Sequence, residues 1–127
     1  MQPLNGKIAI VTGSSRGIGQ AIATRLGRDG ASVVVTYVSN AERAAEVVTA
    51  IRTGGADAIA LQADLRQLGD VRRLFTQTLN HFGRLDILVN NAAGVNVFKP
   101  TAQLTEDDYD SMFTVTKGVY FALQAAA

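Results

Sequence analysis

The sequence predicts an α/β fold in which helices cover both faces of a parallel sheet, and two observations support this prediction. Apolar strand-like segments alternate with amphipathic helix-like segments along all 127 residues. Each strand is joined to the next through a single helix, and such crossover connections make neighbouring strands parallel. We therefore expect one domain, residues 1–127, built as a doubly wound sheet that is truncated after the helix following the fourth strand.

Four strands and four helices are expected. Apolar runs rich in β-branched residues predict strands at 7–12, 31–37, 57–64 and 86–92. Apolar residues at helical spacing predict helices at 17–29, 41–52 and 68–82, and glycines follow the last two of these. Thr105, which precedes three acidic residues, has the pattern of an N-cap of a fourth helix. An apolar stripe along this helix would normally pack on the sheet, and in a truncated chain we expect it to be left exposed and prone to association (Tyr109, Met112, Phe113, Tyr120 and Leu123).

Composition excludes several classes of function. A formal net charge of +1 gives no reason to expect a nucleic acid or an acidic membrane as a partner. Without cysteine, the chain has no disulfide, thiolate zinc site or cysteine nucleophile, which suits a reducing compartment. The first residues are too polar and too few for a signal peptide, and no apolar run reaches the length of a membrane span. We expect a cytoplasmic protein with no metal cluster.

The segment TGSSRGIG, residues 12–19, places three glycines between the first strand and the first helix. A glycine-rich turn in this position lets backbone N–H groups approach an anion, and the helix dipole favours negative charge there. Gly13 would permit the tight turn, Gly17 would leave room for a diphosphate, and Gly19 would let helix and strand pack closely. The alternative is an ordinary strand–turn–helix junction in which glycine serves geometry alone.

The spacing Gly-x-x-x-Gly-x-Gly resembles the cofactor turn of the short-chain dehydrogenase/reductases. The resemblance continues in register through LQADL (61–65), LDILVNNAAG (85–94) and KGVYFALQ (117–124), and VVVTYVSN (33–40) is similar to acyl-carrier-protein reductases and related carbonyl reductases. It implies a Rossmann-type sheet and hydride exchange between a nicotinamide dinucleotide and a small-molecule carbonyl or secondary alcohol. It also implies a homo-oligomer, in which the apolar stripe of the fourth helix lies partly on a partner subunit.

The resemblance implies roles for residues that follow the third and fourth strands. Asp64 would accept a hydrogen bond from the adenine amino group, beside Leu65. Its alternative role is to cap the helix that follows, and the two roles can coexist. Asn91 would support the fourth strand next to the adenosine ribose, although strand-end asparagines also form turns. The family run is Asn-Asn-Ala-Gly, and this sequence has one alanine more. The contact with the ribose could therefore be made by any of three residues (Ala92, Ala93 and Gly94).

The end of the second strand bears on the choice of dinucleotide. An NAD site of this architecture usually places an acid about twenty residues past the glycines, but Tyr37 stands there and no carboxylate appears before Glu42. Arg16 could meet a 2′-phosphate, its alternative being a solvated loop charge. We therefore expect NADP(H), with NAD(H) as the alternative. Four further residues are expected to contact the nucleotide (Ser15, Ile18, Ser39 and Asn40).

The catalytic residues that the resemblance implies are a serine and a tyrosine followed by lysine four residues later. The chain has three tyrosines, and the residues four positions after them are alanine, phenylalanine and glutamine. The tyrosine–lysine pair is therefore not in this chain, which looks like the cofactor-binding half of a reductase and is expected to show no turnover by itself. The alternatives are a non-catalytic dinucleotide-binding module and a fragment too unstable to bind.

The fourth helix departs from the family pattern Val-Asn-x-Lys-Gly, because this sequence reads Val-Thr-Lys-Gly and is one residue short. Counted from the helix start, Thr116 takes the place of the asparagine that holds a water in the family's proton relay. Counted back from Gly118, that place is deleted. Thr116 is thus the catalytic candidate within this chain. His81, the single histidine, lies near a predicted helix end, where a cationic side chain suits the dipole.

Overall fold

Four parallel strands form one sheet in the computed structural model, which describes residues 2–93 and 98–127. The strands are β1 (Ile8–Val11), β2 (Ser32–Tyr37), β3 (Ala58–Gln62) and β4 (Ile87–Val89), and their order is β3-β2-β1-β4. The helices are α1 (Gly17–Arg28), α2 (Ala41–Thr53), α3 (Leu68–Phe82) and α4 (Glu106–Ala126), with a short 3₁₀ turn at Thr101–Gln103. The predicted doubly wound parallel sheet is confirmed.

The strand order places β1 between β2 and β4. In the register, Ile8 lies opposite Ser32 of β2, and Ala9 lies opposite Ile87 of β4. The chain builds outward from β1 to β3 and then crosses back to add β4 on the other side of β1. Ligands of open parallel sheets bind beyond the carboxyl ends of the strands at such a reversal, so the topology directs attention to the ends of β1 and β4.

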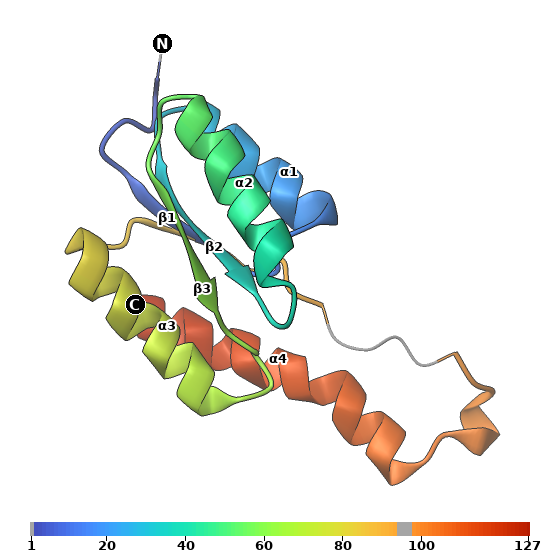
Figure 1. The fold of residues 1–127 in the computed structure, drawn as a ribbon. Helices are drawn as coiled ribbons and strands as arrows, with labels where there is room; N and C mark the ends of the chain where they lie inside the picture. Colours follow the sequence, from blue (N-terminus) through green and yellow to red (C-terminus); the bar gives the residue numbers. More distant parts are fainter. Residues whose placement is uncertain (1, 94–97) are drawn as a thin grey trace.

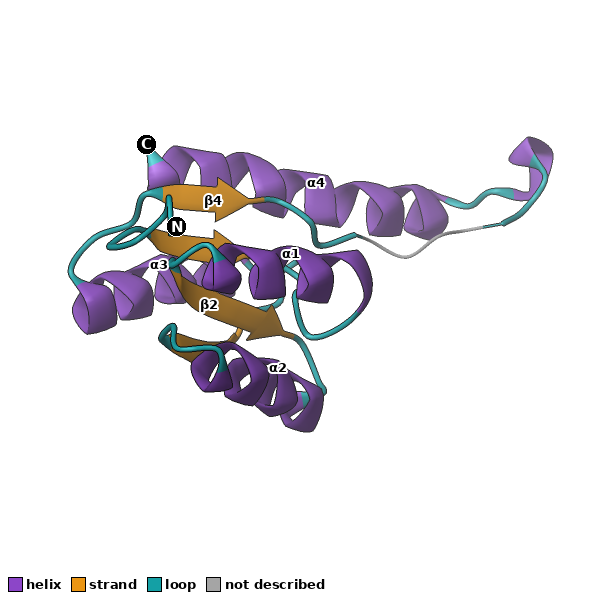
Figure 2. Ribbon diagram, turned by 90° about the horizontal axis from the view of Figure 1, so that it is seen from above, coloured by secondary structure: helices purple, strands orange, loops and turns teal. Residues whose placement is uncertain are grey.

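Helices cover both faces of the sheet, with α1 and α2 on one face and α3 and α4 on the other (Figures 1 and 2). The side chains of β2 alternate accordingly, since Val33 and Val35 join the core under α1 and α2 while Val34 joins the core under α3 and α4. All three valines are fully buried. Burial on both faces explains why β2 is a continuous apolar run.

The expected elements are all present, and their limits differ by a few residues. The third and fourth strands are shorter than predicted, since they end at Gln62 and Val89. Gly83 ends α3 in the left-handed conformation, with φ 78°, whereas at the end of α2 it is Gly55, with φ 100°, that is left-handed. Thr105 is confirmed as an N-cap, since its hydroxyl accepts from the Asp108 N–H at 3.1 Å and its own N–H donates to the Asp108 carboxylate at 3.0 Å.

The apolar stripe of α4 does not pack on the sheet and is left exposed, which is the second of the two expectations for it. Four of its five residues are between 51% and 62% exposed (Tyr109, Phe113, Tyr120 and Leu123). The buried face carries Val115, Gly118 and Ala122 instead. Small residues let the helix backbone approach closely, and a methyl group on Gly118 would overlap the carbonyl oxygen of Leu65. The N-terminal half of α4 projects beyond the rest of the molecule (Figure 1).

Within residues 2–93 and 98–127, no helix combines the length and the apolar character needed to cross a membrane.

Replacing Leu74 with alanine should strongly destabilise the fold. Leu74 is fully buried under the sheet, and a buried leucine truncated to alanine costs about 2–5 kcal/mol of unfolding free energy. The matched control is Leu79→Ala on the same helix, because Leu79 is 48% exposed and should lose less than about 1 kcal/mol. Urea unfolding followed by circular dichroism measures both. Equal losses would contradict the assignment of this core.

The stability of the sheet should fall in acid, in part through Asp86 at the start of β4. Its carboxylate accepts from the Ile8 N–H at 2.9 Å and pairs with Arg84 at 2.5 Å. Arg84, followed by the Ile8 N–H, holds the pKa of Asp86 below its ordinary value. A pKa lowered by folding stabilises the protein above the unfolded pKa, and this stabilisation is lost as the pH falls through the folded pKa.

We therefore expect the unfolding free energy to decline between about pH 5 and about pH 2, and Asp86→Asn to reduce the slope of that decline. Urea titrations at several pH values measure the slope. A variant whose slope equals that of the unsubstituted protein would contradict this role.

Candidate functional site

Thr12 and Asn91 join the carboxyl ends of β1 and β4. The buried Thr12 hydroxyl donates to the Val89 carbonyl at 3.4 Å and accepts from the N–H groups of Asn91 and Ala92, each at 3.0 Å. The Asn91 side-chain amide donates to the carbonyls of Thr12 and Gly13 at 3.1 and 3.2 Å. The segment leaving β4 is thereby fixed beside the glycine turn.

The glycine turn is also held from β2. The Gly13 N–H donates to the Thr36 hydroxyl at 2.9 Å. The Ser14 hydroxyl donates to the Val11 carbonyl at 2.6 Å and accepts from the Thr36 N–H at 3.0 Å. Thr36 and Ser14 are both buried, so these bonds are shielded from competing water. The protein's own contacts therefore set the shape of the turn before any ligand arrives.

The three glycines of the turn differ in surroundings. Gly13 and Gly17 are left-handed, with φ 65° and 58°. A Cβ built on Gly17 would meet no atom within 4 Å, whereas one on Gly19 would overlap the Gly13 carbonyl oxygen. Gly19 thus lets α1 approach β1, and the space in front of Gly17 is open. The N-cap residue Arg16 makes no side-chain capping bond, so free N–H groups of α1 face an open space of the kind that accepts an anion such as a diphosphate.

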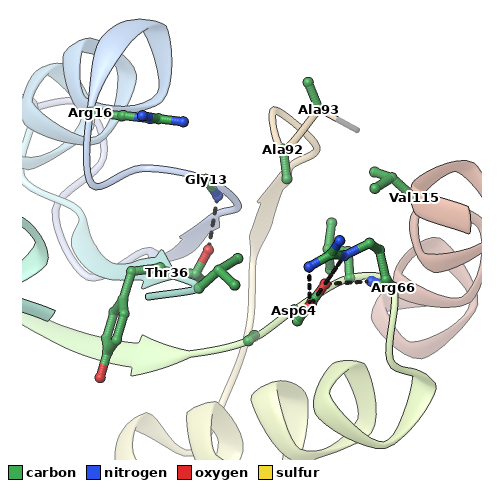
Figure 3. A pocket seen from close by; sticks show the side chains of 12 residues that line it. Gly13, Arg16, Thr36, Asp64, Arg66, Ala92, Ala93 and Val115 are labelled. Carbon is green, nitrogen blue, oxygen red and sulfur yellow. Dashed lines mark hydrogen bonds and ion pairs between the residues drawn. The ribbon is translucent and has the colours of Figure 1, made fainter. Parts of the chain in front are cut away.

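Two adjoining cavities lie along this edge of the sheet. One, of about 390 Å³, extends to the loop after β3 and to Val115 of α4 (Figure 3). The other, of about 660 Å³, extends to the start of α2. Both are lined by the glycine turn, the end of β2 and the segment after β4 (Gly13, Arg16, Tyr37, Val38, Ala92 and Ala93).

Most of the residues predicted for the cofactor come together here. Asp64 and Leu65 line the smaller cavity, and the remaining lining residues belong to the larger one (Ser15, Gly17, Ile18, Ser39, Asn40 and Asn91). Gly19 lies behind the turn. Gly94 is outside the described residues. Thr116 is exposed on α4 and lines neither cavity, although its neighbour Val115 lines the smaller one.

Asp64 does not cap α3, so that alternative is wrong. The N-cap of α3 is Gln67, and the Asp64 carboxylate instead accepts from the Arg66 N–H at 2.9 Å and pairs with its guanidinium at 2.8 Å. The hydrogen bonds from the Arg66 side chain are the main cause that lowers the pKa of Asp64 below its ordinary value. At neutral pH the side chain is therefore an ionised group that only accepts hydrogen bonds.

The larger cavity is lined by two arginines, Arg16 and Arg43, and no carboxylate is among its described lining residues. Asn40 caps α2 by accepting from the Arg43 N–H at 3.1 Å through Oδ1. Its side-chain amide nitrogen keeps two donors. The cavity therefore offers two cationic groups and neutral donors beside a helix N-terminus, a combination suited to a phosphate.

The sequence analysis missed several residues of this site. The hydroxyls of Thr12, Ser14 and Thr36 fix the turn. Arg43 and Arg66 are cations in the cavity linings, and three apolar residues line the cavities as well (Val38, Ala63 and Val115). Arg43 could have been found from the helix start, because a residue three positions after an N-cap lies in the first turn. Arg66 could have been found from its spacing, because an arginine two residues after Asp64 can reach its carboxylate. The described residues hold no group of three or more potential metal ligands.

A model of the short chain dehydrogenase family matches residues 7–127. The chain belongs to the short-chain dehydrogenase family. Among curated relatives, a hydroxynaphthalene reductase-like protein, Arp2, from Metarhizium robertsii is 48% identical over 124 residues, covering 97% of this chain and 46% of the relative. A short chain dehydrogenase/reductase, nsrJ, from Aspergillus novofumigatus is 47% identical, with 97% and 47% covered. This chain thus spans about half the length of the curated relatives it matches.

Solved short-chain dehydrogenases share its fold. One from Burkholderia cenocepacia, in complex with NADP, is 49% identical with a TM-score of 0.92, covering 98% of this chain and 51% of that one. A blue fluorescent protein from a metagenomic library, in complex with NADPH, is 41% identical with a TM-score of 0.92, covering 98% and 51%. The resemblance read from the glycine turn and the three segments after it is confirmed as family membership.

Replacing Thr12 with valine should loosen the junction of β1 and β4. Valine has nearly the same shape but leaves the partly buried N–H groups of Asn91 and Ala92 without their acceptor, at a total cost of about 1–3 kcal/mol of unfolding free energy. Thr12→Ser keeps the hydroxyl and is the control. Chemical denaturation gives the free energies, and amide hydrogen exchange should speed up at residues 91 and 92 in Thr12→Val alone. Unchanged exchange there would contradict the role of this hydroxyl.

Proposed function

We propose that this chain binds NADP(H) in the two adjoining cavities. We further propose that it is the cofactor-binding part of an oxidoreductase that exchanges hydride between the nicotinamide and a small-molecule carbonyl or secondary alcohol. The observation that carries the proposal is the open space before Gly17, where the N-terminus of α1 meets both cavities. Structural neighbours in complex with NADP and NADPH support it.

Each part of the nucleotide has a chemically suitable place. The diphosphate would bind at the glycine turn, where the left-handed Gly17 leaves its approach open. The adenine would enter the smaller cavity beside Asp64, whose ionised carboxylate accepts from an amino group. Its ribose would lie against Ala92 and Ala93, which line both cavities, and Gly94 stays a prediction.

The cationic lining favours NADP(H) over NAD(H). Arg16 and Arg43 would pair with a 2′-phosphate, and Ser39 and Asn40 would donate hydrogen bonds to it. A carboxylate at the end of β2 would repel that phosphate, but Tyr37 occupies the end of the strand. NAD(H) remains the alternative, because its adenosine would fit the same cavities without using these cations.

The chemistry of hydride transfer would come from the bound dinucleotide, and the residues of this chain would bind and orient it. The family's tyrosine–lysine pair is not among these 127 residues, so turnover needs groups that this chain does not supply. Thr116 as a relay residue stays a prediction. We also expect a cytoplasmic location. The full-length protein is expected to form a homo-oligomer, and the four exposed apolar side chains of α4 favour such an assembly.

Replacing Arg16 with alanine should weaken NADPH binding by about tenfold to a hundredfold, because a charge-assisted bond to a phosphate contributes roughly 1.5–3 kcal/mol. NADH affinity should change little, since NADH lacks the 2′-phosphate. The charge-matched control is Arg28→Ala, an exposed arginine at the end of α1 outside both cavity linings. Titration calorimetry measures all affinities. An equal loss for both nucleotides would contradict the assignment of Arg16.

The proposal fails if the folded chain takes up neither NADPH nor NADH. A cooperative thermal transition whose midpoint rises with added NADPH would exclude the alternative of an unstable fragment. A non-catalytic dinucleotide-binding module predicts the same binding. Oxidation of NADPH by the purified protein with any compound of a carbonyl panel would exclude that module.

A further inference from the structure

We propose that Arg66 is a positioning residue of the nucleotide site: it fixes the orientation of the Asp64 carboxylate, which then selects the amino group of adenine. The inference rests on the proposed binding of NADP(H) and assigns a role to a residue outside the glycine turn and outside the cationic end of the larger cavity.

Arg66 and Asp64 form one rigid unit. The guanidinium binds the carboxylate with two parallel hydrogen bonds, Nε to Oδ1 at 3.0 Å and Nη2 to Oδ2 at 2.8 Å, and the Arg66 N–H adds a third to Oδ1 at 2.9 Å. A fork of this kind restricts rotation of both side chains. Figure 3 shows the guanidinium turned onto Asp64 on the side of the cavity next to α4, with both groups lining the cavity.

The backbone beneath this pair is fixed as well. The Asp64 N–H donates to the Asp70 carboxylate of α3 at 3.0 Å, and that carboxylate pairs in turn with Arg73 at 3.0 Å. The carbonyl of Leu65 packs against Gly118 of α4 so closely that a methyl group there would overlap it. The loop is held by two helices, so it presents the carboxylate and the guanidinium at a fixed place.

The hydrogen bonds of Arg66 leave the Asp64 carboxylate able to accept a bond from one further donor. Oδ1 already accepts two bonds from Arg66, while Oδ2 accepts the Nη2–H bond and a longer one from Nε at 3.2 Å. Because each carboxylate oxygen has two lone pairs, Oδ2 retains the better capacity for another donor. The exocyclic amino group of adenine is such a donor. A base with a carbonyl oxygen at that ring position would meet a negative charge instead.

The walls of the smaller cavity suit a flat ring. Apart from the pair, much of the lining is apolar (Val38, Leu65, Ala92 and Val115). Such side chains suit the faces of a purine ring, whose amino edge then meets the Asp64 carboxylate that Arg66 holds in place.

The test compares NADPH with its hypoxanthine analogue, in which an oxygen replaces the adenine amino group. Titration calorimetry is run on the full chain and on Arg66→Ala, Arg66→Lys and Arg72→Ala, after circular dichroism has confirmed folding. Arg72 is an exposed arginine of α3 outside both cavity linings and controls for the loss of one positive charge.

We expect the unsubstituted chain to prefer NADPH. Arg66→Ala should weaken NADPH binding about tenfold and reduce the preference for adenine, because the fork that orients the Asp64 carboxylate is lost. Arg66→Lys keeps the charge but should lose most of the preference, and Arg72→Ala should match the unsubstituted chain. In the nucleotide-free protein, carbon NMR of the Asp64 carboxyl should show its pKa rising in Arg66→Ala.

Two results would overturn the inference, and only one of them also overturns the proposed binding of NADP(H). If Arg66→Ala binds NADPH with unchanged affinity and unchanged preference over the analogue, Arg66 has no such role and the proposed NADP(H) binding survives. If the unsubstituted chain binds neither NADPH nor NADH, the proposed function and this inference fail together.

Discussion

The hydrogen bonds of Thr12 are the constraint on which the rest of the site depends. One hydroxyl serves as donor to Val89 and as acceptor for two consecutive N–H groups after β4. Asn91 returns two bonds to the carbonyls of Thr12 and Gly13. Because β1 is the central strand beside which the strand order reverses, this junction sets the position of the segment after β4 relative to the glycine turn. Both cavities are bounded by these two segments.

The electrostatics of the site are local and are not visible in the net charge of +1. Arginines at the start of α1 and in the first turn of α2 line one cavity, and the N-terminus of α1 adds the partial positive charge of its free N–H groups. In the lining of the smaller cavity, Arg66 forms an ion pair with Asp64 and balances its negative charge. The edge of the sheet thus has two parts: the larger cavity, whose arginines and N–H groups suit an anion, and the smaller cavity, where the Asp64 carboxylate can accept a hydrogen bond. That division suits a phosphorylated nucleotide with an amino-bearing base.

α4 links the second face of the sheet to this edge. Its inward face consists of small and branched residues, so the helix approaches the loop after β3 closely enough for Val115 to line the smaller cavity. The larger aromatic residues consequently point away from the core and remain exposed. Exposed apolar groups along one helix are unusual for a monomer and are typical of a surface that another protein covers. The same packing that shapes the cavity therefore leaves the outer face of α4 free.

Local sequence patterns determined the order of strands and helices, the left-handed turn at Gly13 and Gly17, and the capping of α4 by Thr105, because each depends on residues a few positions apart. Family membership could also be read from ordered motifs. Only the tertiary structure decided which face of α4 is buried, because helical periodicity marks an apolar stripe without showing what lies opposite it. Packing against Leu65 favoured Gly118 and Ala122 over the aromatic stripe. Likewise, the pairing of Asp64 with Arg66 and the entry of Arg43 into the larger cavity required the relative placement of loops and helices, which no local pattern specifies.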